Sequence, residues 1–217
     1  LSHASQRAGC PPLSSPSACG SFRAELAPGV FVGVDQHSDR TFAREKSYFG
    51  PGLVAHVSMA HPTCPRLSRL AAAAAREAGA PVVEGGTYLA MEGPQFSSLA
   101  ESKLYRSWGC DLIGMTNMPE AKLARELELP YASIGMVTDY DCWRVEVAAV
   151  TVTNVLVVLA ANALKARATV AALAQMLKQE ARTPSPIDTA LDMAILTPRA
   201  AWDETLKGKI AALGRFA

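Results

Sequence analysis

The sequence lacks a charge excess and is poor in aromatic residues. Its 217 residues carry 21 basic and 20 acidic side chains, and aromatic residues make up only 6% of the chain. A surface for nucleic acid or an anionic membrane needs a basic patch, and a surface that stacks bases needs exposed rings. The composition therefore predicts no nucleic-acid and no membrane partner, and it favours a small-molecule ligand.

Cysteine pairs and metal-binding patterns are also missing. The five cysteines are widely spaced and form no CxxC pair, so neither a disulfide framework nor a zinc site is predicted. No HxxxH or Cys/His cluster suggests another metal. The patterns GxxxxGK[ST], GxGxxG and GxSxG are absent, which counts against a P-loop ATPase, a dinucleotide enzyme and a serine hydrolase. No run of about 18 residues has membrane-grade hydrophobicity and the first residues lack an apolar signal core, so we expect a cytoplasmic protein.

The remaining pattern is that of one α/β domain. Residues 1–16 are rich in Ser and Pro, and because proline gives a sheet no N–H donor, we expect an irregular arm there. Residues 36–46 are polar and are expected to form a loop. Strands alternate with helices between residues 98 and 137, which indicates parallel strands flanked by helices. The expected strands are 30–34, 53–57, 81–83, 87–91, 111–115 and 134–137, and the expected helices are 65–78, 98–108, 119–128, 153–180, 187–195 and 200–213.

Two of the predicted strand ends carry side chains suited to a ligand. Asp139 and Asp141 follow one strand, and Thr116 follows another, just before a helix. In open α/β sheets ligands bind outside the carboxyl ends of the strands, and a helix N-terminus favours an anion such as phosphate. If residues 138–141 stay extended, both carboxylates point the same way and can accept from N–H donors of one ligand. With Phe96 as an aromatic shelf in a tight loop, these groups suggest a nucleoside pocket, although helix caps and a core Phe remain the plainer alternative.

Three segments carry a resemblance to a known family: Glu-Gly-Pro-Gln-Phe-Ser-Ser-Leu-Ala-Glu-Ser at 92–102, Gly-Met-Thr-Asn-Met-Pro-Glu-Ala at 114–121 and Thr-Asp-Tyr-Asp-Cys-Trp at 138–143. In this order and spacing the sequence resembles the methylthioadenosine phosphorylases, in the trimeric branch of the purine nucleoside phosphorylase family. The likeness implies a three-layer αβα fold with a mixed twisted sheet, a homotrimer, and no metal or other cofactor. It also implies a reaction in which inorganic phosphate, as co-substrate, attacks methylthioadenosine to give adenine and 5-methylthioribose-1-phosphate.

The resemblance also assigns roles to individual residues. Asp139 is expected to act as the acid that faces purine N7 and the 6-amino group, and Asp141 as a second acceptor for that amino group. Family members that use 6-oxopurines carry Asn where this chain has Asp139. A mismatched buried pair costs ~1–3 kcal/mol, so the aspartate favours adenine.

The other expected contacts follow from the same resemblance. Ser97 contacts the base edge, Phe96 lies along the base and ribose, Tyr140 belongs to the substrate-binding set, and the Met115 backbone holds the ribose hydroxyls. The expected phosphate contacts are Ser17, Ala18 and Thr116. The expected wall of the methylthio pocket is Val152, Val155 and Leu156. His56 interrupts an apolar run, and the pattern alone favours a core or interface residue. The resemblance implies that His56 contributes to the 5′ pocket of a neighbouring subunit.

The sequence also departs from the family. The Gly-Gly-Thr-Gly phosphate loop and the later Arg-His pair are absent, so residues 17–217 are expected to form a partial domain without the N-terminal strands. Two alternatives to a complete phosphorylase therefore stay open. One is a non-catalytic purine-binding remnant, and the other is a 6-oxopurine nucleoside phosphorylase, which the aspartate pair disfavours.

Overall fold

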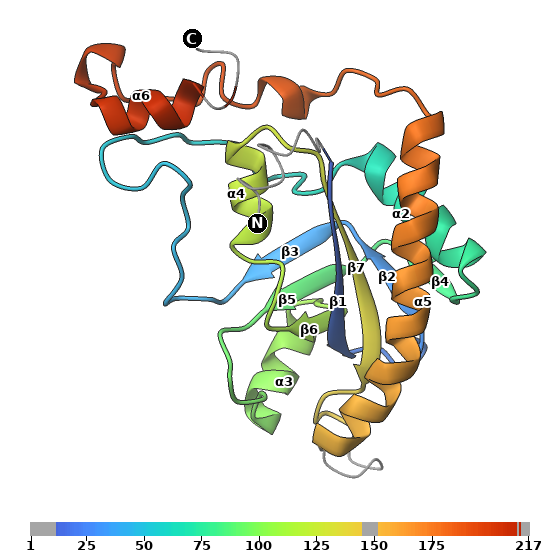
Figure 1. Ribbon diagram of the computed structural model, residues 1–217. Coiled ribbons are helices and arrows are strands. Elements are labelled where there is room, and N and C mark those ends of the chain that lie inside the picture. Colours follow the sequence, from blue (N-terminus) through green and yellow to red (C-terminus); the bar gives the residue numbers. More distant parts are fainter. Residues whose placement is uncertain (1–11, 145–151, 212, 214–217) are drawn as a thin grey trace.

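The computed structural model describes residues 12–144, 152–211 and 213, and it centres on one mixed sheet (Figure 1). The strand order is β3-β5-β6-β1-β7-β2-β4. β1 pairs with β7, β2 with β4, and β5 with both β3 and β6, all in parallel, whereas β1–β6 and β2–β7 are antiparallel. The strands are β1 (Leu13–Ser21), β2 (Phe31–Val34), β3 (Gln36–Asp39), β4 (Val82–Glu84), β5 (Thr87–Ala90), β6 (Leu112–Gly114) and β7 (Tyr131–Asp139).

Helices cover both faces of this sheet, which confirms the three-layer αβα architecture. Along β7, Ile134 and Met136 pack with α2 (Pro65–Glu77) and α5 (Val152–Gln179). The alternate residues Tyr131 and Val137 pack with α4 (Glu120–Glu126) on the opposite face. β7 is therefore apolar on both sides, as expected for a strand buried between two helical layers. The helix α3 (Leu99–Ser107) packs beside β5 and β6 and starts at the predicted capping box of Ser98 and Glu101.

The prediction that residues 1–16 form an irregular arm is wrong for its last four residues. β1 begins at Leu13 and pairs with β7 along its length, near the middle of the sheet. The Leu13 N–H donates to Pro130 O on the β7 side. Because successive N–H groups of a strand point to opposite sides, the missing N–H of Pro16 falls on the other side. There β6 pairs only with Gly20 and Ser21, so Pro16 removes no bond from the β7 ladder.

Three further predictions differ from the structure. The polar segment Gln36–Asp39 is β3, an edge strand that pairs with β5 alone and whose four residues are all partly buried. Residues 53–57 form no strand and make one isolated bridge, Ala55 to Ile195. The C-terminal segments are η1 (Pro186–Thr189), η2 (Arg199–Ala201) and α6 (Glu204–Ala211), shorter than the two helices predicted. Helix α6 packs with Phe49 and Leu53 in a small cluster, whereas Ile187 of η1 packs in the cluster of α2 and β7.

The expectation that no run of about 18 residues has membrane-grade hydrophobicity is wrong for the long helix α5. Residues Leu156–Gln179 reach a mean hydropathy of 1.5 and are, by length and composition alone, sufficient to cross a membrane. The helix nevertheless packs on α2 and β7, where Leu173 is buried and the side-chain amide of buried Asn162 donates to Val137 O at 3.1 Å. These contacts are those of a helix that covers a sheet in a globular domain. Its outward side still leaves Leu156, Val157 and Leu164 exposed.

Candidate active site

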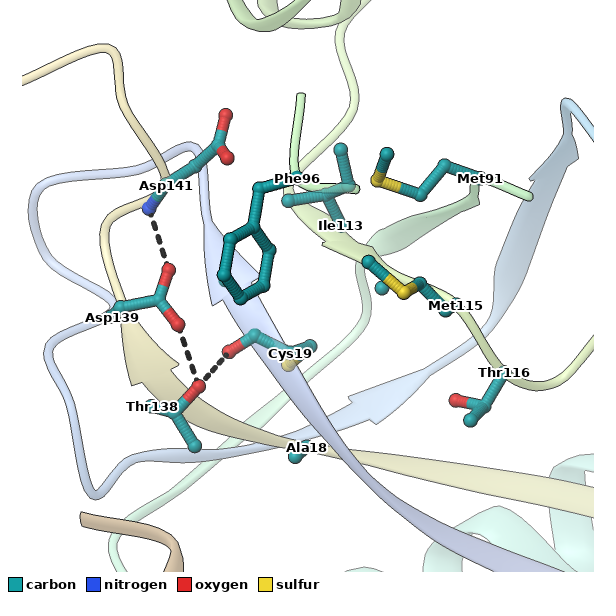
Figure 2. A pocket seen from close by; sticks show the side chains of 12 residues that line it. Ala18, Cys19, Met91, Phe96, Ile113, Met115, Thr116, Thr138, Asp139 and Asp141 are labelled. Carbon is teal, nitrogen blue, oxygen red and sulfur yellow. Dashed lines mark hydrogen bonds between the residues drawn. The ribbon is translucent and has the colours of Figure 1, made fainter. Parts of the chain in front are cut away.

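A cavity of about 190 Å³ opens beside the last residues of the parallel strands β1 and β7 and the turn that follows the antiparallel strand β6 (Figure 2). β1 and β7 are parallel, so Ala18 and Cys19 lie beside Met136 and Val137, and Asp139 follows at the strand end. β6 runs antiparallel to β1, and the residues that end and follow it, Gly114, Met115 and Thr116, line the cavity. The lining residues are Ala18, Cys19, Gly20, Met91, Phe96, Ile113, Gly114, Met115, Thr116, Thr138, Asp139 and Asp141. Six of the predicted site residues therefore line one cavity: Ala18, Phe96, Met115, Thr116, Asp139 and Asp141.

The carboxylate pair reaches the cavity by a different backbone path from the one predicted. The chain does not stay extended, because β7 ends at Asp139 and Asp141 has a φ of 52°. This turn brings the Asp141 N–H to Asp139 Oδ1, at 2.8 Å. Asp139 Oδ2 lies 2.7 Å from Thr138 Oγ1, which is also 3.1 Å from Cys19 O. The Asp139 carboxyl is thus held on both oxygens while it faces the cavity.

The second carboxylate is held by the predicted base-edge residue. Ser97 Oγ donates to Asp141 Oδ1 at 2.6 Å, and Ser97 is itself buried. Ser97 is therefore one step behind the cavity wall and acts on it through Asp141. The neighbouring Phe96 is half-exposed, and Figure 2 shows its ring with Asp139 and Asp141 on one side and Met115 and Thr116 on the other. An open ring in this place is free to stack on a planar ligand, so Phe96 is not the core residue of the plainer alternative.

The opposite end of the cavity is built from Thr116 and Ala18, with buried hydroxyls behind them. Tyr88 Oη lies 3.0 Å from Thr116 Oγ1. Ser17 Oγ donates to the side-chain carbonyl of Asn117 at 3.1 Å, and Tyr131 Oη donates to the same oxygen at 3.1 Å. Ser17 is thus engaged behind the wall, although it is next to Ala18.

A buried histidine lies beneath this end. The His37 ring is 5.9 Å from the Tyr88 ring and 6.3 Å from the Tyr131 ring. Both ring nitrogens are buried, and neither has a hydrogen-bond partner among the described residues. Burial lowers the pKa of His37 to about 4, although the nearby Asp35 and Asp39 act in the opposite direction. The ring is therefore neutral at pH 7.

The remaining predicted residues do not line the cavity. Tyr140 Oη donates to Ala24 O at 3.1 Å, outside the cavity wall. His56 is exposed, and its backbone N–H donates to Ala194 O. Leu156 is exposed near the start of α5. The side chains of Val152 and Val155 lie outside the described residues.

Sequence reasoning missed several lining residues. Thr138 was read as part of the strand end only, although its hydroxyl joins Asp139 to Cys19. Gly20 is needed because a Cβ there would lie 2.8 Å from Asp139 Oδ1, a contact that is too close. The position of Gly20 could have predicted this close contact, since Gly in a strand often marks a bulge or a close approach of another group. The register of β1 on β7 does shift between Cys19 and Gly20. Met91 and Ile113 carried no signal beyond apolar character.

Comparisons with known proteins show the family of this chain and match its fold. Residues 3–175 match the family model of the phosphorylase superfamily. The S-methyl-5′-thioadenosine phosphorylase of Cereibacter sphaeroides is 58% identical over 209 residues, which are 96% of this chain and 72% of that protein.

Solved structures give the same result. A methylthioadenosine phosphorylase from an Antarctic soil metagenomic library superposes with a TM-score of 0.89 at 40% identity, over 98% of this chain and 75% of that chain. Methylthioadenosine phosphorylase from Schistosoma mansoni, solved in complex with adenine, gives a TM-score of 0.79 at 29% identity, over 98% and 75% of the two chains. The chain therefore belongs to the phosphorylase superfamily and, within it, to the S-methyl-5′-thioadenosine phosphorylase family.

Proposed function

We propose that this chain catalyses the phosphorolysis of S-methyl-5′-thioadenosine to adenine and 5-methylthioribose-1-phosphate, a reaction of purine and methionine salvage. A phosphate oxygen forms a bond to the anomeric carbon of the ribose, the bond from this carbon to purine N9 breaks, and its electrons pass to the purine. The observation that carries the proposal is the division of one cavity into a carboxylate end and a hydroxyl end. One end suits the leaving purine and the other suits the phosphate nucleophile.

Asp139 is the proposed acid for the leaving purine. The departing base becomes negative, and a carboxyl that delivers a proton to N7 neutralises it. Thr138 Oγ1 has one hydrogen and lies within reach of two acceptors, Cys19 O and Asp139 Oδ2. When that hydrogen goes to Cys19 O, Thr138 can accept a hydrogen bond from a protonated Asp139. The site thus has a place for the acid form of this carboxyl.

The pair of carboxyls also supports the choice of adenine. A 6-amino group donates hydrogen bonds, and Asp139 and Asp141 are acceptors at the same end of the cavity. A 6-oxo group would bring an acceptor against an acceptor and leave this pair unmatched, at ~1–3 kcal/mol. Ser97 orients Asp141 through its 2.6 Å hydrogen bond, and Phe96 is placed to lie along the base.

The sugar and the phosphate take the rest of the cavity in this proposal. The Met115 backbone holds the ribose hydroxyls, and Thr116 and Ala18 contact phosphate, with Ser17 behind them. Val152, Val155 and Leu156 are proposed to face the methylthio group, with Tyr140 in the outer part of the substrate site. His56 is exposed and away from the cavity lining, so its proposed role needs a homotrimer in which it enters the pocket of a neighbouring subunit.

Inorganic phosphate is the proposed co-substrate, with no cofactor and no metal. Within the described ranges, His, Cys, Asp and Glu side chains form no group of three or more that could hold a metal ion. A cytoplasmic location is part of the same proposal.

One observation favours a second candidate function, adenine binding without turnover. Among the described residues that line the cavity there is no Lys, Arg or His, so the phosphate end has only neutral donors. Neutral donors can hydrogen-bond an anion, but they lack the opposite charge that Lys or Arg adds to such a bond. A chain with this site can bind purine through Asp139 and Asp141 and still bind phosphate weakly.

The deciding experiment is the release of adenine from methylthioadenosine by the purified chain, measured with and without phosphate. Phosphorolysis predicts adenine release that depends on phosphate and a slower reaction with inosine. Adenine binding in calorimetry without turnover at saturating phosphate would support the second candidate instead. Faster cleavage of inosine than of methylthioadenosine would contradict the adenine assignment.

A further inference from the structure

The Tyr88 hydroxyl lies directly behind the cavity wall at the hydroxyl end. Tyr88 is in β5 and is fully buried, whereas Thr116, which its hydroxyl meets at 3.0 Å, is exposed to the cavity. The Tyr88 ring is fixed on its other side by the edge of the His37 ring. A rigid buried phenol therefore touches one of the few polar groups at this end.

The path of the Tyr88 side chain depends on a missing side chain in the neighbouring strand. β5 and β6 pair in parallel, and Gly114 follows two positions after the partner of Tyr88. A Cβ on Gly114 would lie 1.9 Å from Tyr88 Oη and 2.8 Å from the adjoining ring carbon. The phenol thus occupies the space that any other residue at position 114 would fill, which lets its hydroxyl reach the turn that carries Thr116.

The direction of this hydrogen bond follows from counting hydrogens. Burial raises the pKa of the Tyr88 phenol, so the phenol keeps its proton at neutral pH. Within the part of the chain that the structure describes, Thr116 Oγ1 is the acceptor within reach of that proton. A buried phenol that failed to donate would leave a polar group unsatisfied, which is costly. Tyr88 therefore donates, and the single hydrogen of Thr116 is left to point into the cavity.

We propose that Tyr88 is a positioning residue for the nucleophile: it fixes the Thr116 hydroxyl as a donor toward the anion in the cavity. This inference rests on the proposed function, because it takes the anion to be phosphate. A free threonine hydroxyl rotates and presents either its hydrogen or its lone pairs. With Tyr88 donating, only the hydrogen faces the anion. Such orientation matters most where no basic side chain lines the described cavity wall.

The test is Tyr88→Phe, which removes the hydroxyl and keeps the ring. The expected result is an increase in the KM for phosphate of about three- to tenfold, the worth of one neutral hydrogen bond. The KM for methylthioadenosine should stay within about twofold. Tyr105→Phe is the matched control: Tyr105 is buried against Phe22 and does not itself line the cavity, so both KM values should stay unchanged.

A double-mutant cycle separates positioning from a general loss of structure. If Tyr88 acts through Thr116, then Thr116→Val and the double variant Tyr88→Phe/Thr116→Val have the same KM for phosphate. Additive losses in the double variant, or equal increases in both KM values of Tyr88→Phe, would overturn the inference.

Calorimetry that measures the direct binding of inorganic phosphate to the wild type and the same variants separates this inference from the proposed function. If the wild-type chain binds phosphate but does not release adenine, the proposed function fails, and weaker phosphate binding by Tyr88→Phe still supports the inference. Equal phosphate binding by the wild type and Tyr88→Phe would overturn the inference even where turnover is intact. If neither the wild type nor any variant bound phosphate, both the inference and the proposed function would be overturned.

Discussion

The proposed purine end and the proposed phosphate end of the cavity are built from different kinds of groups. At the purine end both carboxylates are held by short hydrogen bonds, at 2.8 Å from the Asp141 N–H to Asp139 and at 2.6 Å from Ser97 to Asp141. At the phosphate end a single exposed hydroxyl, Thr116, rests on a buried phenol. The first end uses charge, and the second uses the orientation of neutral dipoles. Base choice is therefore expected to survive changes elsewhere, whereas phosphate affinity is expected to depend on the geometry of a few hydroxyls.

Replacing the acid at the purine end should have the largest effect. Asp139→Asn keeps the size of the side chain but removes the proton donor, so kcat for methylthioadenosine should fall about 10²- to 10⁴-fold, the usual worth of a general acid. The KM for phosphate should change little. The measurement is phosphate-dependent adenine release at saturating substrates.

Glu204→Gln is the matched control for this change from a carboxylate to an amide. Its side chain is 89% exposed at the start of α6, so the variant should behave as the wild type. An Asp139→Asn variant with wild-type kcat would show that the charge difference between the two ends has no catalytic meaning.

The second largest effect concerns the buried histidine beneath the phosphate end. The pKa of His37 is lowered from 6.5 to about 4, chiefly by burial. As pH falls below 6.5, the unfolded chain binds a proton that the folded chain does not, so stability is present above pH 6.5 and is lost toward pH 4. Between pH 7.5 and pH 5 the loss should be about 2 kcal/mol, and it would approach roughly 3 kcal/mol near pH 4.

His37→Phe separates this effect from other titrations. The phenyl ring fits the same apolar contacts with Tyr88 and Tyr131, so the variant should lose little stability between pH 7.5 and pH 5. Urea unfolding at both pH values measures the difference. Partial burial raises the pKa of Asp39, but hydrogen bonds from Lys122 and Thr41 outweigh it and lower the pKa to about 2. The stability that Asp39 contributes is therefore lost only below about pH 4, outside the range of the His37 measurement. Parallel pH dependence in the wild type and His37→Phe would contradict the assignment.

Sequence patterns could place the carboxylates and Phe96 at the cavity, but they could not supply the contacts behind the hydroxyl end, for a physical reason. The purine end comes from short continuous segments, so Asp139, Asp141 and Phe96 could be placed by a strand end and a tight loop. Even there the backbone differs from the extended path that was predicted, because Asp141 has a φ of 52° and does not continue the strand. The phosphate end joins β1, β5 and β6, and the Tyr88–Thr116 contact spans 28 residues. No local pattern predicts which buried tyrosine meets which strand end.

The fold shows the same limit. The amphipathic helix α2 and the capping box before α3 were predicted correctly because their signals are local. The first four residues of β1 were read as part of an irregular arm because Pro16 argues against a central strand. Whether Pro16 costs a bond depends on which side of the strand its nitrogen faces and on how far β6 extends along β1, and both are set by strand register. Register joins residues far apart in sequence, which a pattern cannot supply.

The smallest effect tests whether the two ends are independent. Ser97→Ala removes the hydrogen bond to Asp141 and leaves Asp139 untouched, so the KM for methylthioadenosine should increase about three- to tenfold, less than a fully buried charged pair would give because Asp141 faces the cavity. The adjacent Ser98→Ala is the matched control, since Ser98 caps α3 and should cost about 1 kcal/mol of stability with no change in KM. Steady-state kinetics with each substrate varied in turn measures both. If Ser97→Ala raised the KM for phosphate as much as that for methylthioadenosine, the two ends would be coupled through Phe96, which lies between them (Figure 2). An unchanged KM for phosphate would instead mean that base recognition and nucleophile binding are separate devices that share one cavity.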